Sequence, residues 1–93
     1  MINLDSFKNP SQIQMDIAQR MVKRRKEMKI NQEELSLSSS VSLGSIRRFE
    51  RTGEISLASL VKIGFALDAV SDFSKLFERR GYSSIEEVID ENK

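Results

Sequence analysis

Apolar residues recur at intervals of three and four along most of the chain, which is the period of an amphipathic helix. A first helix is expected to begin at Pro10 and Ser11, because proline fits the first helical position and Gln14 stands three residues after Ser11, as in a capping box. One stripe of this helix should be buried, and it consists of Ile13, Ile17, Met21 (or Ala18) and Met28.

Two shorter helices are expected next, separated by only about three residues. Asn31 is a good N-cap for a helix over about 31–38, and two acidic residues follow it in the first turn, where the helix dipole favours them. Ser42 is an N-cap for a helix over about 42–51, which ends near Gly53. Two short helices joined by such a turn are typical of the helix-turn-helix, whose second helix lies in the DNA major groove.

The last third of the chain is also helical in pattern. Ser56 caps a stretch with a further apolar stripe, a short segment begins at Ser71 or Asp72, and a final amphipathic stretch lies within 83–91. No alternating apolar run predicts a sheet, so the fold class is expected to be all-α, with five or six short helices. The apolar stripe after Ser56 consists of Leu57, Leu60, Ile63 (or Val61) and Leu67.

Composition narrows the classes of function. The 93 residues, 39% hydrophobic and 31% charged, predict one small soluble domain. We expect neither a membrane span nor a signal peptide, and a cytoplasmic location. Cysteine and histidine are absent, which removes disulfides, thiolate metal sites and histidine-dependent catalysis. No glycine-rich phosphate loop or paired carboxylates are evident, so we expect neither an enzyme nor a bound cofactor or metal.

Charge is distributed unevenly along the chain. Residues 20–51 carry nine basic and four acidic side chains, a net charge of +5, whereas residues 52–93 carry eight acidic and five basic ones. A basic half beside an acidic half favours a polyanion-binding face, although two solvated faces would give the same counts.

Residues 30–53, INQEELSLSSSVSLGSIRRFERTG, resemble the helix-turn-helix of the phage-repressor family (Cro/cI-type, also called XRE). The resemblance extends over about residues 13–70 and implies a lambda-repressor-like bundle. It divides the chain into an N-terminal arm (1–10), a DNA-binding domain (11–70) and a C-terminal helical extension (71–93). The residues that match without gaps are Gln32, Glu34, Leu35, Ser42, Ile46, Glu50 and Gly53.

The resemblance implies roles for individual side chains. The exposed face of the helix over 42–51 would read base edges, arginine by bidentate bonds to guanine and leucine by contact with a thymine methyl. Gly44 would allow close backbone approach, at a helix-propensity cost of about 1 kcal/mol. The expected base-contacting residues are Leu43, Gly44, Arg47 and Arg48, and the expected phosphate-contacting residues are Gln32, Ser42, Arg51 and Thr52. The alternatives are that Gln32 and Ser42 serve only their helix ends and that the arginines are merely solvated.

Other positions have structural roles by the same resemblance. Arg25 and Glu50 fall where the family has a partly buried ion pair that joins the first helix to the third. Leu35, Val41, Ile46 and Phe49 are expected in the core, with Leu60, Ile63 and Leu67 behind them. Ser39 and Ser40 depart from the family pattern, because an apolar residue and a glycine usually stand there. A buried Ser39 would need a backbone partner, and a turn with positive φ tolerates Ser40 less well than glycine.

We therefore expect a sequence-specific regulator of transcription, a repressor, that binds double-stranded DNA as a homodimer. Residues 42–77 also resemble, more loosely, antitoxins of kinase-type (HipA-like) toxin pairs, which would add a toxin protein as partner. The alternative from another class is a protein-interaction module that has lost DNA binding. The apolar residues of the extension either form a dimer or partner surface or complete the monomer's core, and they are Phe73, Leu76, Phe77, Tyr82, Ile85, Val88 and Ile89.

Overall fold

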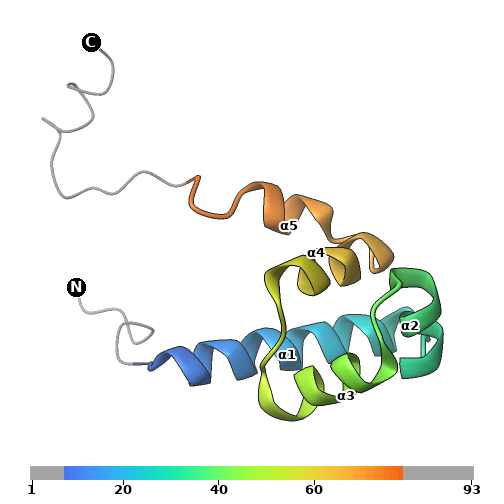
Figure 1. Cartoon of the computed structure of the whole chain (residues 1–93). Coiled ribbons are helices and arrows are strands. Elements are labelled where there is room, and N and C mark those ends of the chain that lie inside the picture. The colour runs from blue at the N-terminus through green and yellow to red at the C-terminus, as the bar shows by residue number, and fades with distance from the viewer. Residues whose placement is uncertain (1–7, 79–93) are drawn as a thin grey trace, which may run out of the picture.

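The computed structural model describes residues 8–78, which form five helices and no strand (Figure 1). The expected all-α class is confirmed for this part of the chain. The expected N-terminal arm lies largely outside the described residues, as do Tyr82, Ile85, Val88 and Ile89. The helices are α1 (Pro10–Glu27), α2 (Gln32–Ser39), α3 (Leu43–Thr52), α4 (Leu57–Ala66) and α5 (Val70–Ser74).

Polar N-caps fix where four of these helices begin. Asn31, Ser42 and Ser56 each accept a hydrogen bond from the backbone N–H three residues later, which satisfies one of the free donors of the first turn. The helix α1 begins at Pro10 as expected, but the expected capping box of Ser11 and Gln14 was wrong, because the box is made by Asn9 and Gln12. Pro10 occupies the first helical position, where it needs no N–H, so the N-cap has to be the residue before it.

The fifth helix is short and lacks such a cap. It begins one residue before the expected Ser71, and its N-cap residue, Ala69, makes no side-chain hydrogen bond. The ring of Phe73 lies against Gly64 of α4, where a Cβ atom would come within 2.3 Å of it. Phe73 therefore packs within the chain and attaches α5 to α4.

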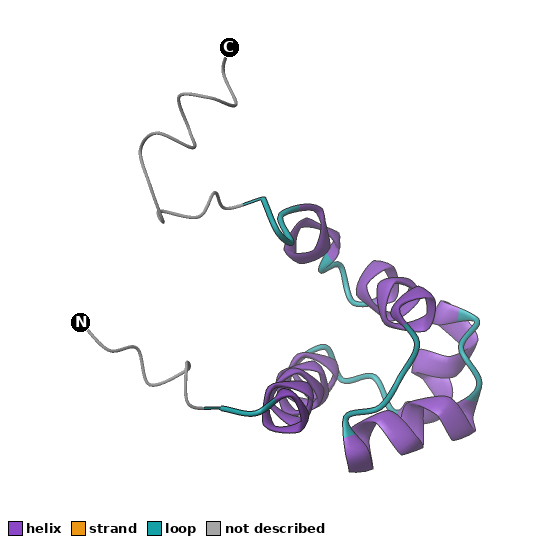
Figure 2. Cartoon of the chain, turned by 60° about the vertical axis from the view of Figure 1, so that its left-hand side comes forward, coloured by secondary structure: helices purple, strands orange, loops and turns teal. Residues whose placement is uncertain are grey.

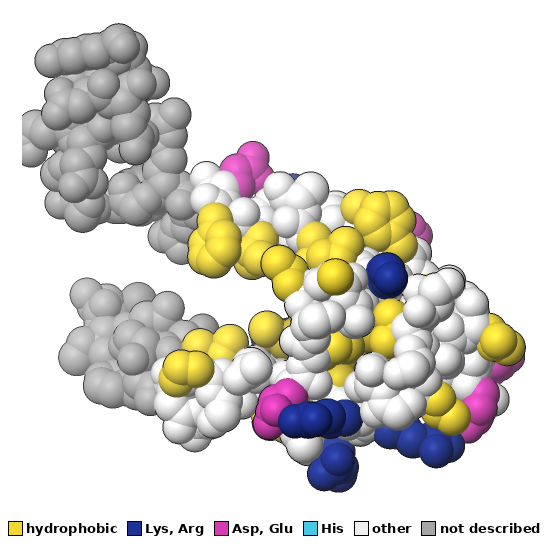
Figure 3. Space-filling model, viewed as in Figure 1, with side chains coloured by type: hydrophobic (Ala, Val, Ile, Leu, Met, Phe, Trp, Pro, Cys, Tyr) yellow, Lys and Arg dark blue, Asp and Glu magenta, His cyan; other side chains and the backbone are white. Residues whose placement is uncertain are grey.

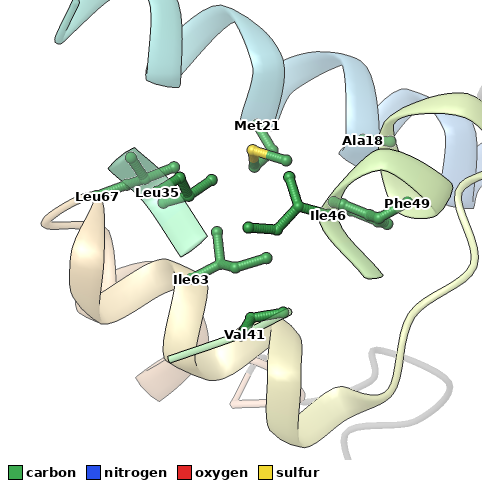
Figure 4. Packing of buried hydrophobic residues seen from close by; sticks show 8 residues of the cluster. All are labelled: Ala18, Met21, Leu35, Val41, Ile46, Phe49, Ile63 and Leu67. Atoms are coloured by element: carbon green, nitrogen blue, oxygen red, sulfur yellow. The ribbon is translucent and has the colours of Figure 1, made fainter. Parts of the chain in front are cut away.

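The core lies between α1, α2, α3 and α4 (Figure 4). Side chains from all four helices point toward one another there, and the largest fully buried ones are Phe49, Leu35, Ile46 and Ile63. Burial of each such side chain contributes about 1.5–3 kcal/mol relative to leaving it in water. The full set of buried apolar residues is Ala18, Met21, Leu35, Val41, Ile46, Phe49, Ile63 and Leu67.

The helices are arranged so that α3 is presented on one side of the molecule. Both α3 and α4 pack against other core helices, α3 along α1 and α4 against α2, while α5 packs on α4. Figures 1 and 2 show α5 beyond α4, on the side of the molecule away from α3. No other described helix covers the outer side of α3.

Three positions expected in buried stripes are exposed. Ile13 is 42% exposed, Met28 38% and Leu57 65%. Ile13 and Leu57 stand in the first turns of α1 and α4, and Met28 is the C-cap of α1. A helical period identifies the face that turns inward, but it does not show which residues at the helix ends are covered.

Two glycines provide a matched test of this packing. Gly53 has φ +81°, and a Cβ there would come within 2.9 Å of the Gln14 carbonyl carbon of α1, whereas a Cβ at Gly44 would meet nothing within 4 Å. We expect Gly53→Ala to lower the free energy of unfolding by more than about 1–2 kcal/mol, because the left-handed conformation and the contact with α1 both oppose a side chain. Gly44→Ala should raise it by about 0.5–1 kcal/mol through helix propensity.

Urea unfolding followed by circular dichroism measures both changes. Equal effects of the two substitutions would contradict the close approach of Gly53 to α1.

Candidate nucleic-acid interface

The turn between α2 and α3 is built from the serines that depart from the family pattern. Ser40 has φ +62°, the left-handed conformation in which glycine is usual, and it is the C-cap of α2. Ser39 is buried, and its Oγ accepts a hydrogen bond from the Val41 N–H at 3.1 Å. The Ser36 hydroxyl donates to the Val41 carbonyl at 2.6 Å. Each polar group that the turn buries is thereby bonded to the backbone.

Ser42 places the first residues of α3. Its Oγ accepts from the Ser45 N–H at 3.1 Å and donates to the Ser45 Oγ at 2.8 Å. The expected N-cap role is therefore present. A phosphate contact by the same hydroxyl stays a prediction.

A buried ion pair joins α3 to α1. The Arg25 Nε and Nη2 donate to the two carboxylate oxygens of Glu50, at 2.9 and 3.1 Å. Arg25 Nη1 donates to the Ile30 carbonyl at 2.9 Å. Both side chains are almost fully buried, with 9% and 13% exposed. The ion pair expected from the sequence is thus present, and its bidentate geometry fixes the direction of both side chains.

Gln32 extends this network to the surface. Its Nε2 donates to the Glu50 Oε1 at 2.9 Å, and its Oε1 accepts from the Arg47 Nε at 3.3 Å. The sequence predicted only a helix-end or phosphate role for Gln32. The side chain also connects the buried ion pair to an arginine of α3, which leaves one amide N–H for a phosphate.

The outer side of α3 carries the expected base-reading positions. Gly44, Arg47 and Arg48 are exposed and Leu43 is half-buried. Arg51 is exposed as well. Lys and Arg side chains gather along the lower edge of the molecule in Figure 3, over α3, with acidic side chains beside them.

Those acids are partners that sequence reasoning missed. Arg47 Nη2 lies 3.2 Å from the Glu33 Oε1, and Arg48 Nη2 lies 2.8 Å from the Glu54 Oε1. All four side chains are between 57% and 61% exposed, so each pair contributes at most about 1 kcal/mol. The acidic first turn of α2 was visible in the sequence, but its pairing with α3 was not.

Thr52 ends α3 rather than standing free. Its hydroxyl donates to the Arg48 carbonyl at 2.7 Å, and its Oγ1 accepts from the Glu54 N–H at 3.1 Å. The phosphate contact that the resemblance implies for this hydroxyl would require breaking its bond to Arg48. Arg51 has no such internal bond among residues 8–78 and is the better candidate.

An open hollow lies between α3 and the start of α4. It has a volume of about 280 Å³, and its lining includes Arg48, Glu54 and the N-cap Ser56. Two more serines, Ser45 and Ser59, face it. The hollow therefore lines up hydroxyl groups beside an arginine, next to the first turn of α4.

Arg24 shows that part of the basic run has a structural role. Its Nε donates to the Leu67 carbonyl at 3.1 Å, and its Nη2 lies 3.4 Å from the Asp68 carbonyl oxygen. Arg24 thus holds the end of α4 against α1. The net charge of residues 20–51 consequently overstates the number of cations that are free to meet a polyanion.

Apolar side chains are also exposed on α4 and just after α5. Leu76 is 57% exposed and Phe77 95%, so these two side chains do not complete the core of the described residues. Phe65 of α4, 66% exposed, was expected in neither role. Phe73 instead completes the chain's own packing.

Residues 8–78 contain neither a metal-binding cluster of side chains nor a membrane-spanning helix. No group of three or more acidic side chains there is placed to hold a metal ion. No helix in the same range is long and apolar enough to cross a membrane.

The buried ion pair of Glu50 and the exposed ion pair of Glu54 can be compared by replacing each glutamate with glutamine. We expect Glu50→Gln to lower the free energy of unfolding by about 3–5 kcal/mol, because it leaves the buried Arg25 without its counter-ion. Glu54→Gln, which removes the same charge from an exposed pair, should cost less than about 1 kcal/mol. Urea unfolding measures both, and similar losses for the two variants would contradict the distinction.

Comparisons with models of protein families, with curated proteins and with solved structures gave no match. The arrangement of side chains around α3 is therefore the basis for inferring what the protein binds.

Proposed function

We propose that the protein is a sequence-specific DNA-binding regulator of transcription, a repressor of the phage-repressor (Cro/cI-type) kind. In this proposal α2 and α3 are the two helices of a helix-turn-helix. The observation that carries the proposal is that α3 is fixed to α1 by a buried, bidentate ion pair, while its opposite side exposes two arginines. A recognition helix needs this combination of a rigid inner face and a polar outer face.

Base reading is assigned to the outer face of α3. Arg47 and Arg48 can each bond bidentately to guanine, a contact that contributes about 1–3 kcal/mol of discrimination. Leu43 would meet a thymine methyl, and Gly44 allows the helix backbone to approach the groove. The open space around Gly44, with no atom within 4 Å of a built Cβ, supports that last role.

Phosphate contacts are assigned to the edges of the same surface. Gln32 stands at the N-terminus of α2, which is a favourable place for an anion. Ser42 stands at the N-terminus of α3 and Arg51 at its end, whereas the Thr52 hydroxyl is already bonded to the Arg48 carbonyl. The serine-lined hollow beside Arg48 supports a further backbone contact at the start of α4.

A homodimer would supply the affinity that one such domain lacks. Two half-sites one helical turn apart are the usual solution for helix-turn-helix proteins. Exposed Phe65 on α4 and exposed Leu76 and Phe77 just after α5 support a contact role for this part of the chain, away from α3. The same exposed aromatic side chains favour the second candidate function, an antitoxin that binds a toxin protein while it represses its own operon.

Titration with random duplex DNA tests the proposal. We expect binding that weakens steeply with salt, with log K falling by about 0.9 per log unit of salt for each phosphate neutralised. Binding that is absent, or insensitive to salt, would contradict DNA recognition and leave a protein-interaction module.

Two kinds of arginine variant refine the test. Arg47→Ala or Arg48→Ala should relax preference at one base pair and cost about 1–3 kcal/mol on the preferred sequence. Arg51→Ala should weaken binding to all sequences about equally. It should also reduce the slope of log K against log salt concentration by about 1, because one phosphate contact is lost. Selection of bound sequences from a random pool, followed by titration, measures both effects.

A further inference from the structure

Arg47 uses only one edge of its guanidinium within the protein. The group is planar and has five N–H donors. Nε donates to the Gln32 Oε1 at 3.3 Å, and one Nη2 N–H donates to the Glu33 Oε1 at 3.2 Å. These two donors lie on the same long edge of the guanidinium. The other three N–H groups have no protein partner among residues 8–78.

The unused donors are the ones that guanine recognition needs. Two roughly parallel N–H groups can bond the O6 and N7 acceptors of guanine at once. Nη1 and the second N–H of Nη2 form such a pair at the end of the side chain. An arginine held along its long edge therefore keeps a complete bidentate edge for a base.

Glu33 takes no part in the capping box of the helix that carries it. The capping box of α2 is completed by Asn31 and Glu34, which bond each other's backbone N–H groups. Glu33 is the second residue of α2, is 58% exposed, and makes its side-chain bond to Arg47.

The second acceptor, Gln32, is itself fixed from the core. Its amide donates to Glu50, which the buried Arg25 holds through two hydrogen bonds. A continuous series of hydrogen bonds therefore runs from α1 through α3 and α2 to the Arg47 guanidinium. Arg48 differs, because among residues 8–78 only its Nη2 is bonded, to Glu54 in the loop after α3.

We propose that Glu33 is a specificity-determining positioning residue. With Gln32 it holds the long edge of Arg47, so that the end of the guanidinium is directed to a guanine. Its carboxylate also opposes binding of Arg47 to phosphates of any sequence. This proposal rests on the proposed function, since it requires that Arg47 reads a base.

The test compares Glu33→Ala with Glu33→Gln. Equilibrium titration would use the selected duplex, the same duplex changed at the base pair at which Arg47→Ala weakens the preference, and a random duplex. We expect Glu33→Ala to reduce the preference at that base pair by about 2- to 12-fold, the cost of ordering one long side chain. Glu33→Gln keeps an acceptor and should retain most of the preference.

Both variants should bind the random duplex about 1.5- to 5-fold more tightly, because Arg47 loses a counter-ion. Glu78→Ala is the control, since it removes the same charge from an exposed position beyond α5. It should leave the base preference unchanged.

The double variant Arg47→Ala, Glu33→Ala separates positioning from a direct effect on DNA. We expect it to show the same base preference as Arg47→Ala alone. A further loss in the double variant would overturn the proposal, as would an unchanged preference in Glu33→Ala. A wild-type protein that binds no duplex DNA would overturn the proposed function as well, whereas the preceding outcomes leave it standing.

Discussion

The buried ion pair between Arg25 and Glu50 is the interaction on which the arrangement of the outer surface depends. Two charges with so little exposure are tolerated only when each is bonded in full. Arg25 meets this condition with the two oxygens of Glu50 and the Ile30 carbonyl. The same carboxylate accepts a hydrogen bond from Gln32, so that the start of α2 and the ends of α1 and α3 are fixed relative to one another by a single polar cluster.

In the turn between α2 and α3, polar groups are buried as well, and small neutral serine hydroxyls form the hydrogen bonds that they need. The Ser39 side chain is buried. Only three residues connect α2 to α3, and the chain must change direction within them. Glycine would allow the left-handed residue at Ser40 more readily, but serine adopts it here at a cost of about 1–2 kcal/mol. The hydroxyls of Ser36 and Ser39 bond both backbone groups of Val41, which compensates by fixing the residue that follows the turn.

Much of the helical core could be predicted from sequence because its signals are local. The periodic apolar residues predicted the buried positions Met21, Ile63 and Leu67, and the polar caps predicted the starts of α2, α3 and α4. The N-cap Asn9 was missed because Ser11 offered an equally good local pattern. The partners of Arg47 and Arg48 were not predictable in this way. Glu33 precedes Arg47 by fourteen residues, and their approach depends on how the turn directs α3 past α2.

Gly44 is a position at which substitutions during evolution could change the base preference of the proposed recognition helix. A new side chain there would enter open space on the outer face of α3, with no neighbouring atom within 4 Å of its first carbon. Under the proposed function, substitutions at this position can add or remove a base contact without disturbing the core. If the proposed function holds, the fold separates the residues that maintain its stability from one position at which the recognised DNA sequence is free to diverge.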